Sequence, residues 1–425
     1  MTQVGLFELA KTSAKIGVLS FGGPAAQIAL MHRVFVEEKK WIDEERYLHA
    51  LNYCMLLPGP EAQQLATYIG WLLHGVRGGV VAGLLFVLPG AAIVLSLSWL
   101  YAAHGSAPLV EAAFFGVRAA VLAFVVEAIF RISRRALKSR ADAVAAIAAF
   151  TALTVFAVPF PIVILAAAAI GAWRAQGGEP VRIAKARGGD IRRLGSSVAV
   201  WSVVWIAPVF ASMLSLGPEH VLTRVGALFS KLALVTFGGA YALLSYLRQQ
   251  AVEREGWLSA AQMIDGLGLA ETTPGPLVLV NQFVGFMGGW QADGGGLLTA
   301  ALAALMASWC TFAPSFLWIF AGAPYAERLR ANARAAGALR AITAAVLGVI
   351  GNLTLWFAVK ILFSETVTLT APWNAVIELP KAGSFDFSAA AITVAAAIAL
   401  MRFHAGAAAV VVSAVAAGVA FALIA

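Results

Sequence analysis

The sequence predicts an all-α polytopic membrane protein made of two repeats that have opposite orientations in the membrane. Three observations carry this prediction: the composition is strongly apolar, the two halves of the chain repeat each other, and glycines and prolines interrupt the same apolar segments in both halves. Charged residues make up only 12% of the chain, against about 25% in soluble domains. The mean hydropathy of +0.84 agrees with an integral membrane protein.

The internal repeat is visible without alignment gaps. Residues 21–60 match residues 237–276 at 11 of 40 positions. The shared positions include Phe21-Gly22-Gly23 with Phe237-Gly238-Gly239, Trp41 with Trp257, and Pro58-Gly59-Pro60 with Pro274-Gly275-Pro276, each pair 216 positions apart. A duplicated apolar chain with interrupted helices is typical of secondary transporters. The two tryptophans are expected to be membrane-interface anchors, because Trp is enriched at that boundary.

Apolar segments of about 20 residues are the unit in which a membrane chain is counted. Read in order, they predict thirteen crossings, at 4–31, 47–73, 79–103, 109–130, 143–158, 160–175, 197–217, 221–247, 258–288, 296–322, 337–363, 387–402 and 404–424. Re-entrant hairpins at the breaks would lower the number by even steps. The single segment at 197–217 separates two sets of six and therefore inverts the second set. We expect a first repeat at 1–175, a loop and linker helix at 176–220, and a second repeat at 221–425.

The basic loops orient these segments. Three Lys/Arg-rich loops, at 131–140, 174–193 and 328–334, all follow an even number of crossings, so the positive-inside rule places them and the N-terminus in the cytoplasm. The acidic loop at 364–386 then lies outside. The first loop conflicts with this arrangement, because Lys39 and Lys40 would be external. The net charge of +8 is accordingly explained by membrane orientation, and no nucleic-acid partner is expected.

Motifs for enzymatic chemistry are missing from the sequence. The histidines form no HExxH pattern, no GxGxxG or GxxxxGK[ST] loop is present, and Cys54 and Cys310 are isolated. These observations argue against a metalloenzyme and against a nucleotide-driven pump within this chain. We predict no enzyme activity, no metal and no cofactor.

The helix breaks are the candidate binding site. Backbone groups freed by a break cost several kcal/mol each if they face lipid, so they must face protein or a watery cavity. A half-helix that begins after Pro60 or Pro276 would present free N–H groups and a partial positive charge, which attract anions. Gly and Pro also occur in membrane helices merely to permit packing, but recurrence at duplicated positions favours a site. The break residues are Gly22, Gly23, Pro24, Pro58, Gly59, Pro60, Gly238, Gly239, Pro274, Gly275 and Pro276.

Polar and charged residues near the breaks complete the candidate set. The polar ones are Glu61, Gln63, Gln64, Glu271, Thr272, Thr273, Asn281 and Gln282. Their amide and hydroxyl donors could hydrogen-bond a tetrahedral oxyanion, and Glu61 or Glu271 could exchange protons or instead end a helix at the surface. Arg118 and Arg340 recur in equivalent apolar segments. A buried cation there is a functional candidate, while a guanidinium that reaches the interface would only set orientation.

Several motifs resemble the chromate ion transporter family of the long, two-domain type. They are FGGP (21–24), KKW (39–41), LPGPEAQQLATYIGWLLHG (57–75), FVLPG (86–90), FGG (237–239), Trp257 and TTPGP (272–276), and the resemblance spans roughly 5–130 and 225–365. It implies a bacterial inner-membrane permease with two oppositely oriented domains that exports chromate and confers chromate resistance. The second half departs from the pattern, since Ala240 replaces Pro24 and Leu277–Val280 replace Glu61–Gln64. The first half is therefore expected to carry more of the recognition.

The leading functional hypothesis is secondary export of chromate, a divalent oxyanion, with proton antiport as one way to drive it. Leaving a negative-inside cell is electrically downhill for a dianion, by about 2.3 kcal/mol per charge per 100 mV. A permease for sulfate, which mimics chromate in shape, is the main alternative. A membrane-embedded oxidoreductase is a weaker one, because the chain has no flavin, nicotinamide or metal-ligand pattern. The expected partners are the oxyanion and the lipid bilayer, and a homodimer is a candidate assembly.

Overall fold

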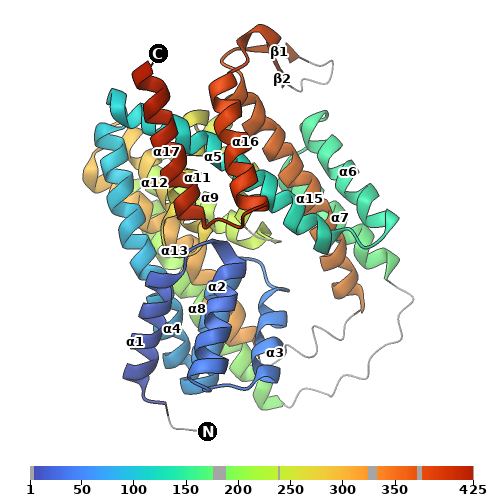
Figure 1. Cartoon of the computed structure of the whole chain (residues 1–425). Helices are drawn as coiled ribbons and strands as arrows, with labels where there is room; N and C mark the ends of the chain where they lie inside the picture. Colours follow the sequence, from blue (N-terminus) through green and yellow to red (C-terminus); the bar gives the residue numbers. More distant parts are fainter. Residues whose placement is uncertain (1–3, 176–187, 238–239, 324–332, 371–375, 425) are drawn as a thin grey trace. The chain divides into compact units, whose positions relative to one another are not determined.

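The structure, a computed structural model, describes residues 4–175, 188–237, 240–323, 333–370 and 376–424. Helices dominate this part of the chain (Figure 1). Six of them are long and apolar enough to cross a membrane: α4 (Glu61–His104), α5 (Pro108–Ala136), α8 (Gly188–Leu216, from Leu194 onward), α13 (Leu297–Gly322), α15 (Ala333–Leu362) and α17 (Ala407–Ile424). Two shorter apolar helices are α7 (Phe160–Arg174) and α16 (Phe387–Met401). The chain is a helical, multi-pass membrane protein.

The two repeats have the same order of elements. The first runs through α1 (Leu6–Leu19), α2 (Gly23–His32), the π-helix η1 (Arg33–Glu38) and α3 (Glu44–Cys54) to its Pro-Gly-Pro loop and α4. The second runs through α9 (Val221–Val235), α10 (Ala240–Leu247), the π-helix η2 (Arg248–Arg254) and α11 (Ala260–Thr272) to its Pro-Gly-Pro loop, the short 3-10 helix η3 (Leu277–Leu279), α12 (Val280–Gln291) and α13. In chain order α5, α6 (Arg140–Thr154) and α7 follow in the first repeat, and α15, α16 and α17 follow in the second.

Each π-helix ends in the same way. The N–H of Trp41 donates to the carbonyl of Phe35 at 2.9 Å, and that of Trp257 donates to the carbonyl of Ala251 at 2.8 Å. These two bonds are related by the 216-residue spacing of the repeat. Trp41 and Trp257 are 7% and 6% exposed, so both side chains are buried in the protein, and their role as membrane-interface anchors stays a prediction.

The second break of each repeat leads into a helical hairpin. In α4 the backbone leaves helical geometry at His74 and Gly75, and the arm formed by residues 61–73 folds back on the rest of the helix. Gly70 lies so close to Gly78 that a Cβ on either would overlap the other's backbone. In the second repeat α12 packs on α13 in the same way, with Gly285 against Ala303. An arm of 13 residues is about 20 Å long, too short to cross the hydrocarbon core by itself.

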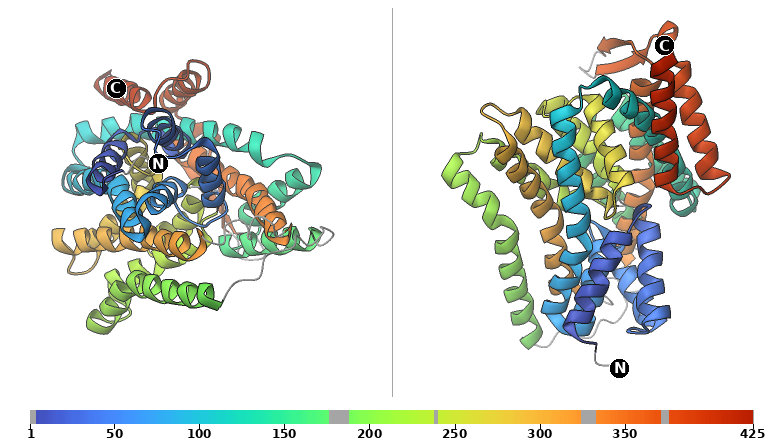
Figure 2. Two further views of the ribbon diagram at one scale, coloured as in Figure 1. Left: turned by 90° about the horizontal axis from the view of Figure 1, so that it is seen from below. Right: turned by 60° about the vertical axis from the view of Figure 1, so that its left-hand side comes forward.

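The described chain packs as two compact units, and each takes segments from both repeats. The first unit contains residues 1–99, 178–240 and 273–335, and the second contains residues 100–177, 241–272 and 336–425. In the first unit α13 packs on α8, α9 and α12; Figure 2 shows α8 as a long helix alongside α13. In the second unit the α16–α17 hairpin packs on α5 (Figure 1), and small residues such as Gly116 and Ala414 let the helices approach closely.

A short β-hairpin interrupts the helices in the predicted acidic external loop. Strands β1 (Thr366–Thr370) and β2 (Val376–Pro380) pair antiparallel, and the 3-10 helix η5 (Ala382–Ser384) follows them. Salt bridges hold the hairpin at its base, with Lys360 on Glu378 at 2.8 Å and Lys381 on Glu365 at 2.6 Å. The sequence predicts only a loop at 364–386, so the two strands are a correction to that expectation.

Candidate functional site

The first break of each repeat separates two helices where the sequence predicts it. In the first repeat α1 ends at Leu19 and α2 begins at Gly23, with Pro24 in its first turn. The φ angles of Gly22 and Gly23 are +84° and +76°, in the left-handed region that glycine adopts without a steric penalty. In the second repeat the break falls between α9 and α10, and Gly238 and Gly239 lie outside the described residues.

The second break of each repeat is a Pro-Gly-Pro loop with a glycine at its centre. Helix α3 ends at Cys54 and α4 begins at Glu61, while α11 ends at Thr272 and η3 begins at Leu277. The φ angles of the central glycines are +112° at Gly59 and +104° at Gly275. Both loops thus require glycine at the centre, where the backbone turns between two half-helices.

The two kinds of break meet across the repeats. The N–H of Gly59 donates to the carbonyl of Thr236 at 2.9 Å, and the N–H of Gly275 donates to the carbonyl of Ser20 at 2.8 Å. Thr236 is the counterpart of Ser20, just as Gly275 is the counterpart of Gly59, at the same spacing of 216. Each Pro-Gly-Pro loop is therefore bonded to the first break of the other repeat. Such a reciprocal exchange of contacts is the pattern that a two-fold relation produces.

A third pair of positions completes this symmetric centre. Gly59 lies beside Ser315 of α13, and Gly275 lies beside Gly90 of α4, where a Cβ on Gly275 would be 3.4 Å from the Gly90 Cα. Ser315 and Gly90 each follow a proline inside their helix. Sequence reasoning missed Ser315, although the spacing of prolines in α4 and α13 could have pointed to it. Four breaks and two proline-containing helices thus converge in the first unit.

Three buried glutamines anchor the centre through their amide N–H groups. Gln64 donates from Nε2 to the Pro58 carbonyl at 2.7 Å, Gln27 to the Gly275 carbonyl at 2.6 Å, and Gln282 to the Ala91 carbonyl at 2.9 Å. These acceptors fix the orientation of each amide, because the flipped amide would set one oxygen against another. The three side-chain oxygens are buried without a hydrogen-bond partner. Gln27 was not among the predicted site residues.

The other predicted amides behave alike. Gln63 donates to the Thr67 hydroxyl at 3.4 Å and Asn281 to the Thr311 hydroxyl at 3.0 Å, while their side-chain oxygens also lack partners. Buried unpaired polar atoms are rare and mark places where water or a ligand completes the bonding. The centre can offer acceptor oxygens to water or to a proton-bearing group. Its donors for an anion are the second amide hydrogens of Gln64 and Gln282, the Ser315 hydroxyl and backbone N–H groups. The Gln27 amide also donates to the Ser20 carbonyl at 3.4 Å.

The remaining polar candidates near the loops differ in their surroundings. Glu61, at the start of α4, is half-buried, and Thr273 is buried with 5% exposure. The Thr272 hydroxyl donates to the Gly268 carbonyl of its own helix at 3.0 Å. Glu271 is 7% exposed and accepts a hydrogen bond from the hydroxyl of Tyr241, which is buried to the same extent. Both members of this pair belong to the second unit.

Arg118 is engaged by an acidic residue that sequence reasoning missed. Its guanidinium makes a two-point contact with Asp265 of α11 in the second unit, at 2.7 Å from Nε and 2.8 Å from Nη2. Tyr101 donates to the same carboxylate at 2.7 Å, and Asp265 is fully buried. Asp265 is 147 residues away in the chain, so no local pattern could reveal the pair.

Arg340 also has a carboxylate partner, but closer to the surface. It donates to Asp142, in the first turn of α6, at 2.8 and 3.2 Å, and its own side chain is 56% exposed. The hydrogen bond from Arg340, supported by the Ser139 hydroxyl and the Lys138 N–H, lowers the pKa of Asp142 to about 2. This exposure favours the alternative in which Arg340 reaches the membrane interface and sets orientation, and it disfavours a role in a buried binding site.

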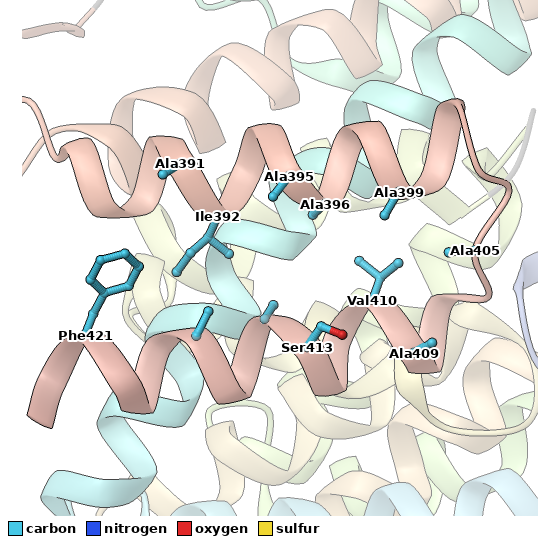
Figure 3. A pocket seen from close by; sticks show the side chains of 12 residues that line it. Ala391, Ile392, Ala395, Ala396, Ala399, Ala405, Ala409, Val410, Ser413 and Phe421 are labelled. Carbon is cyan, nitrogen blue, oxygen red and sulfur yellow. The ribbon is translucent and has the colours of Figure 1, made fainter.

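An apolar hollow in the second unit contains none of the predicted site residues. It has a volume of about 350 Å³ between α16 and α17, and alanines such as Ala395 and Ala409 line it together with Val410 and Phe421 (Figure 3). Its lining fits a hydrocarbon chain and not a hydrated anion. Within the described ranges, no group of three or more His, Cys, Asp or Glu side chains is placed to hold a metal ion.

Comparisons with known proteins agree with the geometry of the repeats. The chromate transporter family matches residues 7–172 and 223–420, one stretch in each repeat. The chain is 33% identical to the chromate transport protein of Pseudomonas aeruginosa over 346 residues, which cover 80% of this chain and 78% of that protein. It is 28% identical to a probable chromate transport protein of Synechococcus elongatus over 349 residues, covering 82% and 83% of the two chains.

A third relative is the chromate transport protein of Cupriavidus metallidurans, which is 28% identical over 339 residues and covers 79% of this chain and 78% of its own. No solved structure matches the chain. The family match covers most of both repeats, including every break and the helices that follow them. The chain therefore belongs to the chromate transporter family.

Proposed function

We propose that the protein is a secondary transporter that carries chromate out of the cytoplasm across a bacterial inner membrane and thereby confers chromate resistance. Membership of the family and the names of its relatives support the substrate. The observation that carries the transport mechanism is the reciprocal bonding of the Pro-Gly-Pro loops to the first breaks of the opposite repeat. Transporters built from repeats bind their substrates at such interfaces between broken helices.

The substrate site of this proposal lies at the Pro-Gly-Pro loops of the first unit. The first arm of α4 starts directly after Pro60, so its first turn carries backbone N–H groups without intrahelical partners and the positive end of the helix dipole. The second amide hydrogen of Gln64 and the hydroxyl of Ser315 are further donors near the loops, whereas Gln27 uses its amide on the carbonyls of Gly275 and Ser20. Chromate, a tetrahedral dianion, would accept hydrogen bonds from several such donors at once.

The proposed topology has thirteen segments and two inverted repeats. In this topology the segments that contain the breaks enter the membrane as short half-helices. The longer helices of the α4 and α12–α13 hairpins span the rest of its thickness. Reciprocal contacts support a two-fold relation between the repeats, and the basic loops support an axis in the membrane plane. In this arrangement each loop can release its partner on one side while the other stays bonded, which gives two equivalent states open to opposite sides.

The experiment that tests the proposal is chromate uptake into everted membrane vesicles that carry the protein. An interior-positive potential, equivalent to the orientation of the cell, should accelerate uptake, because it favours movement of the dianion by about 2.3 kcal/mol per charge per 100 mV. Vesicles without the protein are the control. Uptake that does not exceed theirs would contradict a role in chromate transport. Added sulfate distinguishes a general oxyanion permease, since strong inhibition of chromate uptake by sulfate at the same concentration would make chromate one substrate among several.

A matched pair of variants ties the uptake to the loops. Gln64→Leu removes the amide that donates to the Pro58 carbonyl, whereas Gln249→Leu changes a half-buried glutamine of η2. We expect the first to lose most of its uptake and the second to keep it, at equal amounts of protein in the membrane. Equal uptake by both variants would remove the first Pro-Gly-Pro loop from the proposed site.

A further inference from the structure

Three acidic side chains are buried in the described part of the chain, and they differ in their partners. Asp265 is bound by Arg118 and Asp142 by Arg340, each through two hydrogen bonds from a guanidinium. Glu271 is bound by the hydroxyl of Tyr241, a neutral donor. A carboxylate removed from water and held without a cation in contact is costly in its ionised form. Glu271 is thus the buried acid whose surroundings favour binding a proton.

The charged groups that face Glu271 do not place an unpaired cation beside its carboxylate. Helix α5 contributes Glu127 and Arg131, which act on Glu271 with opposite signs. Arg131 is already paired with Glu127 at 3.6 Å. Helix α17, which also packs on α11, has no ionisable side chain, and α10 contributes Tyr241. The tyrosine hydroxyl can donate to the carboxylate or to the carbonyl oxygen of the protonated acid, so the contact persists in both states.

The position of the pair connects it to both breaks of the second repeat. Tyr241 lies two residues after Gly239 at the start of α10, and Glu271 lies three residues before Pro274 at the end of α11. Their hydrogen bond ties together α10, which follows the first break, and α11, which precedes the second. At the equivalent positions the first repeat has Ala25 and Met55, which cannot titrate. Of the two repeats, the second therefore has this pair at these positions and the first does not.

We propose that Glu271, held by Tyr241, is a proton-binding site that couples outward movement of chromate to inward movement of a proton. This inference rests on the proposed function and adds its coupling ion. The carboxylate takes up one proton and becomes neutral in one state of the transporter, and it returns that proton to water in the other state. The bond between Tyr241 and Glu271 carries the change to α10 and α11, whose ends form the breaks.

The test uses the purified full chain in proteoliposomes, with the membrane potential clamped to zero and a pH difference of about one unit imposed. Each coupled proton should change the chromate gradient at equilibrium by about tenfold, because one pH unit corresponds to about 1.4 kcal/mol. Glu271→Gln should still exchange chromate for chromate across the membrane but lose the response to the pH difference. Glu219→Gln, which alters an exposed carboxylate before α9, should respond like the wild type.

Each outcome bears on one of the two proposals. If the wild type moves chromate but ignores the pH difference, proton coupling is overturned while the proposed function stands. A Glu271→Gln variant that responds like the wild type would overturn the assignment to this residue. Absence of any chromate movement by the wild type would remove both proposals. Should Glu271→Gln fail to fold, Tyr241→Phe keeps the carboxylate, and it should retain coupling with a displaced pH profile; an unchanged profile would contradict the role of the pair.

Discussion

The backbone N–H of Gly59 is bonded to the carbonyl of Thr236 at 2.9 Å, although the two residues belong to different repeats. The equivalent bond from Gly275 to Ser20 is 2.8 Å long. Because the two bonds are separate, one can open while the other stays closed. A pair of this kind allows two states, in each of which one bond is open and the other closed. Alternating access to the two sides of a membrane requires two such states.

Alanine at the centre of either Pro-Gly-Pro loop should disable the protein. Gly59→Ala and Gly275→Ala place a side chain at φ angles of +112° and +104°, which costs about 1 to 3 kcal/mol of strain per site. At Gly275 the new Cβ would also meet the Leu279 Cδ1 at 2.9 Å. We expect a lower melting temperature in detergent and loss of chromate uptake.

Gly195→Ala is the control for these variants, since a Cβ at Gly195 in α8 meets nothing within 4 Å and its φ angle is not positive. It should match the wild type in both measurements. Loop variants that melt and transport like Gly195→Ala would mean that the loops tolerate other backbone geometries, and the proposed release of one loop at a time would lose its structural basis.

Removing Arg118 should lower the stability of the second unit, and any loss of transport should follow from that loss of stability. Arg118→Gln leaves Asp265, which is fully buried, without its cation, and breaking a buried pair in this way typically costs about 3 to 5 kcal/mol. The double variant Arg118→Gln, Asp265→Asn restores a neutral hydrogen-bonded pair and should recover most of the lost stability. Thermal unfolding in detergent measures both effects.

Transport by the double variant decides the role of Arg118. We expect chromate uptake to return together with stability, because the guanidinium is occupied by Asp265 and Asp265 by Tyr101. A double variant that is stable but inactive would show instead that the guanidinium acts on chromate itself, as the sequence analysis predicts.

The sequence was most informative where local chemistry decides the structure. Runs of glycine and proline favour a helix break, and these runs recur at the same spacing, so the positions of the breaks at Gly22 and Pro58 followed from residue type and recurrence. The partner of Arg118 could not be predicted, because the pair depends on the packing of α5 against α11. The orientation of Gln64 was equally hidden, since its acceptor is a carbonyl exposed only by the turn at Pro58.

Acid should weaken the contact between α6 and α15 over a defined range. Hydrogen bonds from Arg340, Ser139 and the Lys138 N–H lower the pKa of Asp142 from 3.8 to about 2. A depressed pKa means that the ionised group stabilises the fold above its unfolded value, and that this contribution is lost as the pH falls from about 4 to about 2. Arg340→Gln should therefore be less stable near neutral pH and should lose less on acidification.

Melting curves of the wild type and Arg340→Gln at several pH values measure that difference. Arg402→Gln, in an exposed position after α16, serves as the control for loss of one positive charge. Parallel pH profiles for the wild type and Arg340→Gln would contradict the assigned cause of the shift in Asp142, because other carboxylates titrate equally in both proteins.

Gln27 should prove as important as the residues of the loops, although it lies in α2. Its amide donates to the Gly275 carbonyl at 2.6 Å, and its side chain is fully buried. Gln27→Leu copies the residue at the equivalent position of the second repeat, Leu243, but leaves that carbonyl without a partner, at a cost of about 1 to 3 kcal/mol. We expect uptake to fall at least as far as in Gln64→Leu. Uptake equal to that of Gln249→Leu would indicate that the second loop needs no side-chain anchor, and that recognition depends on the first loop alone.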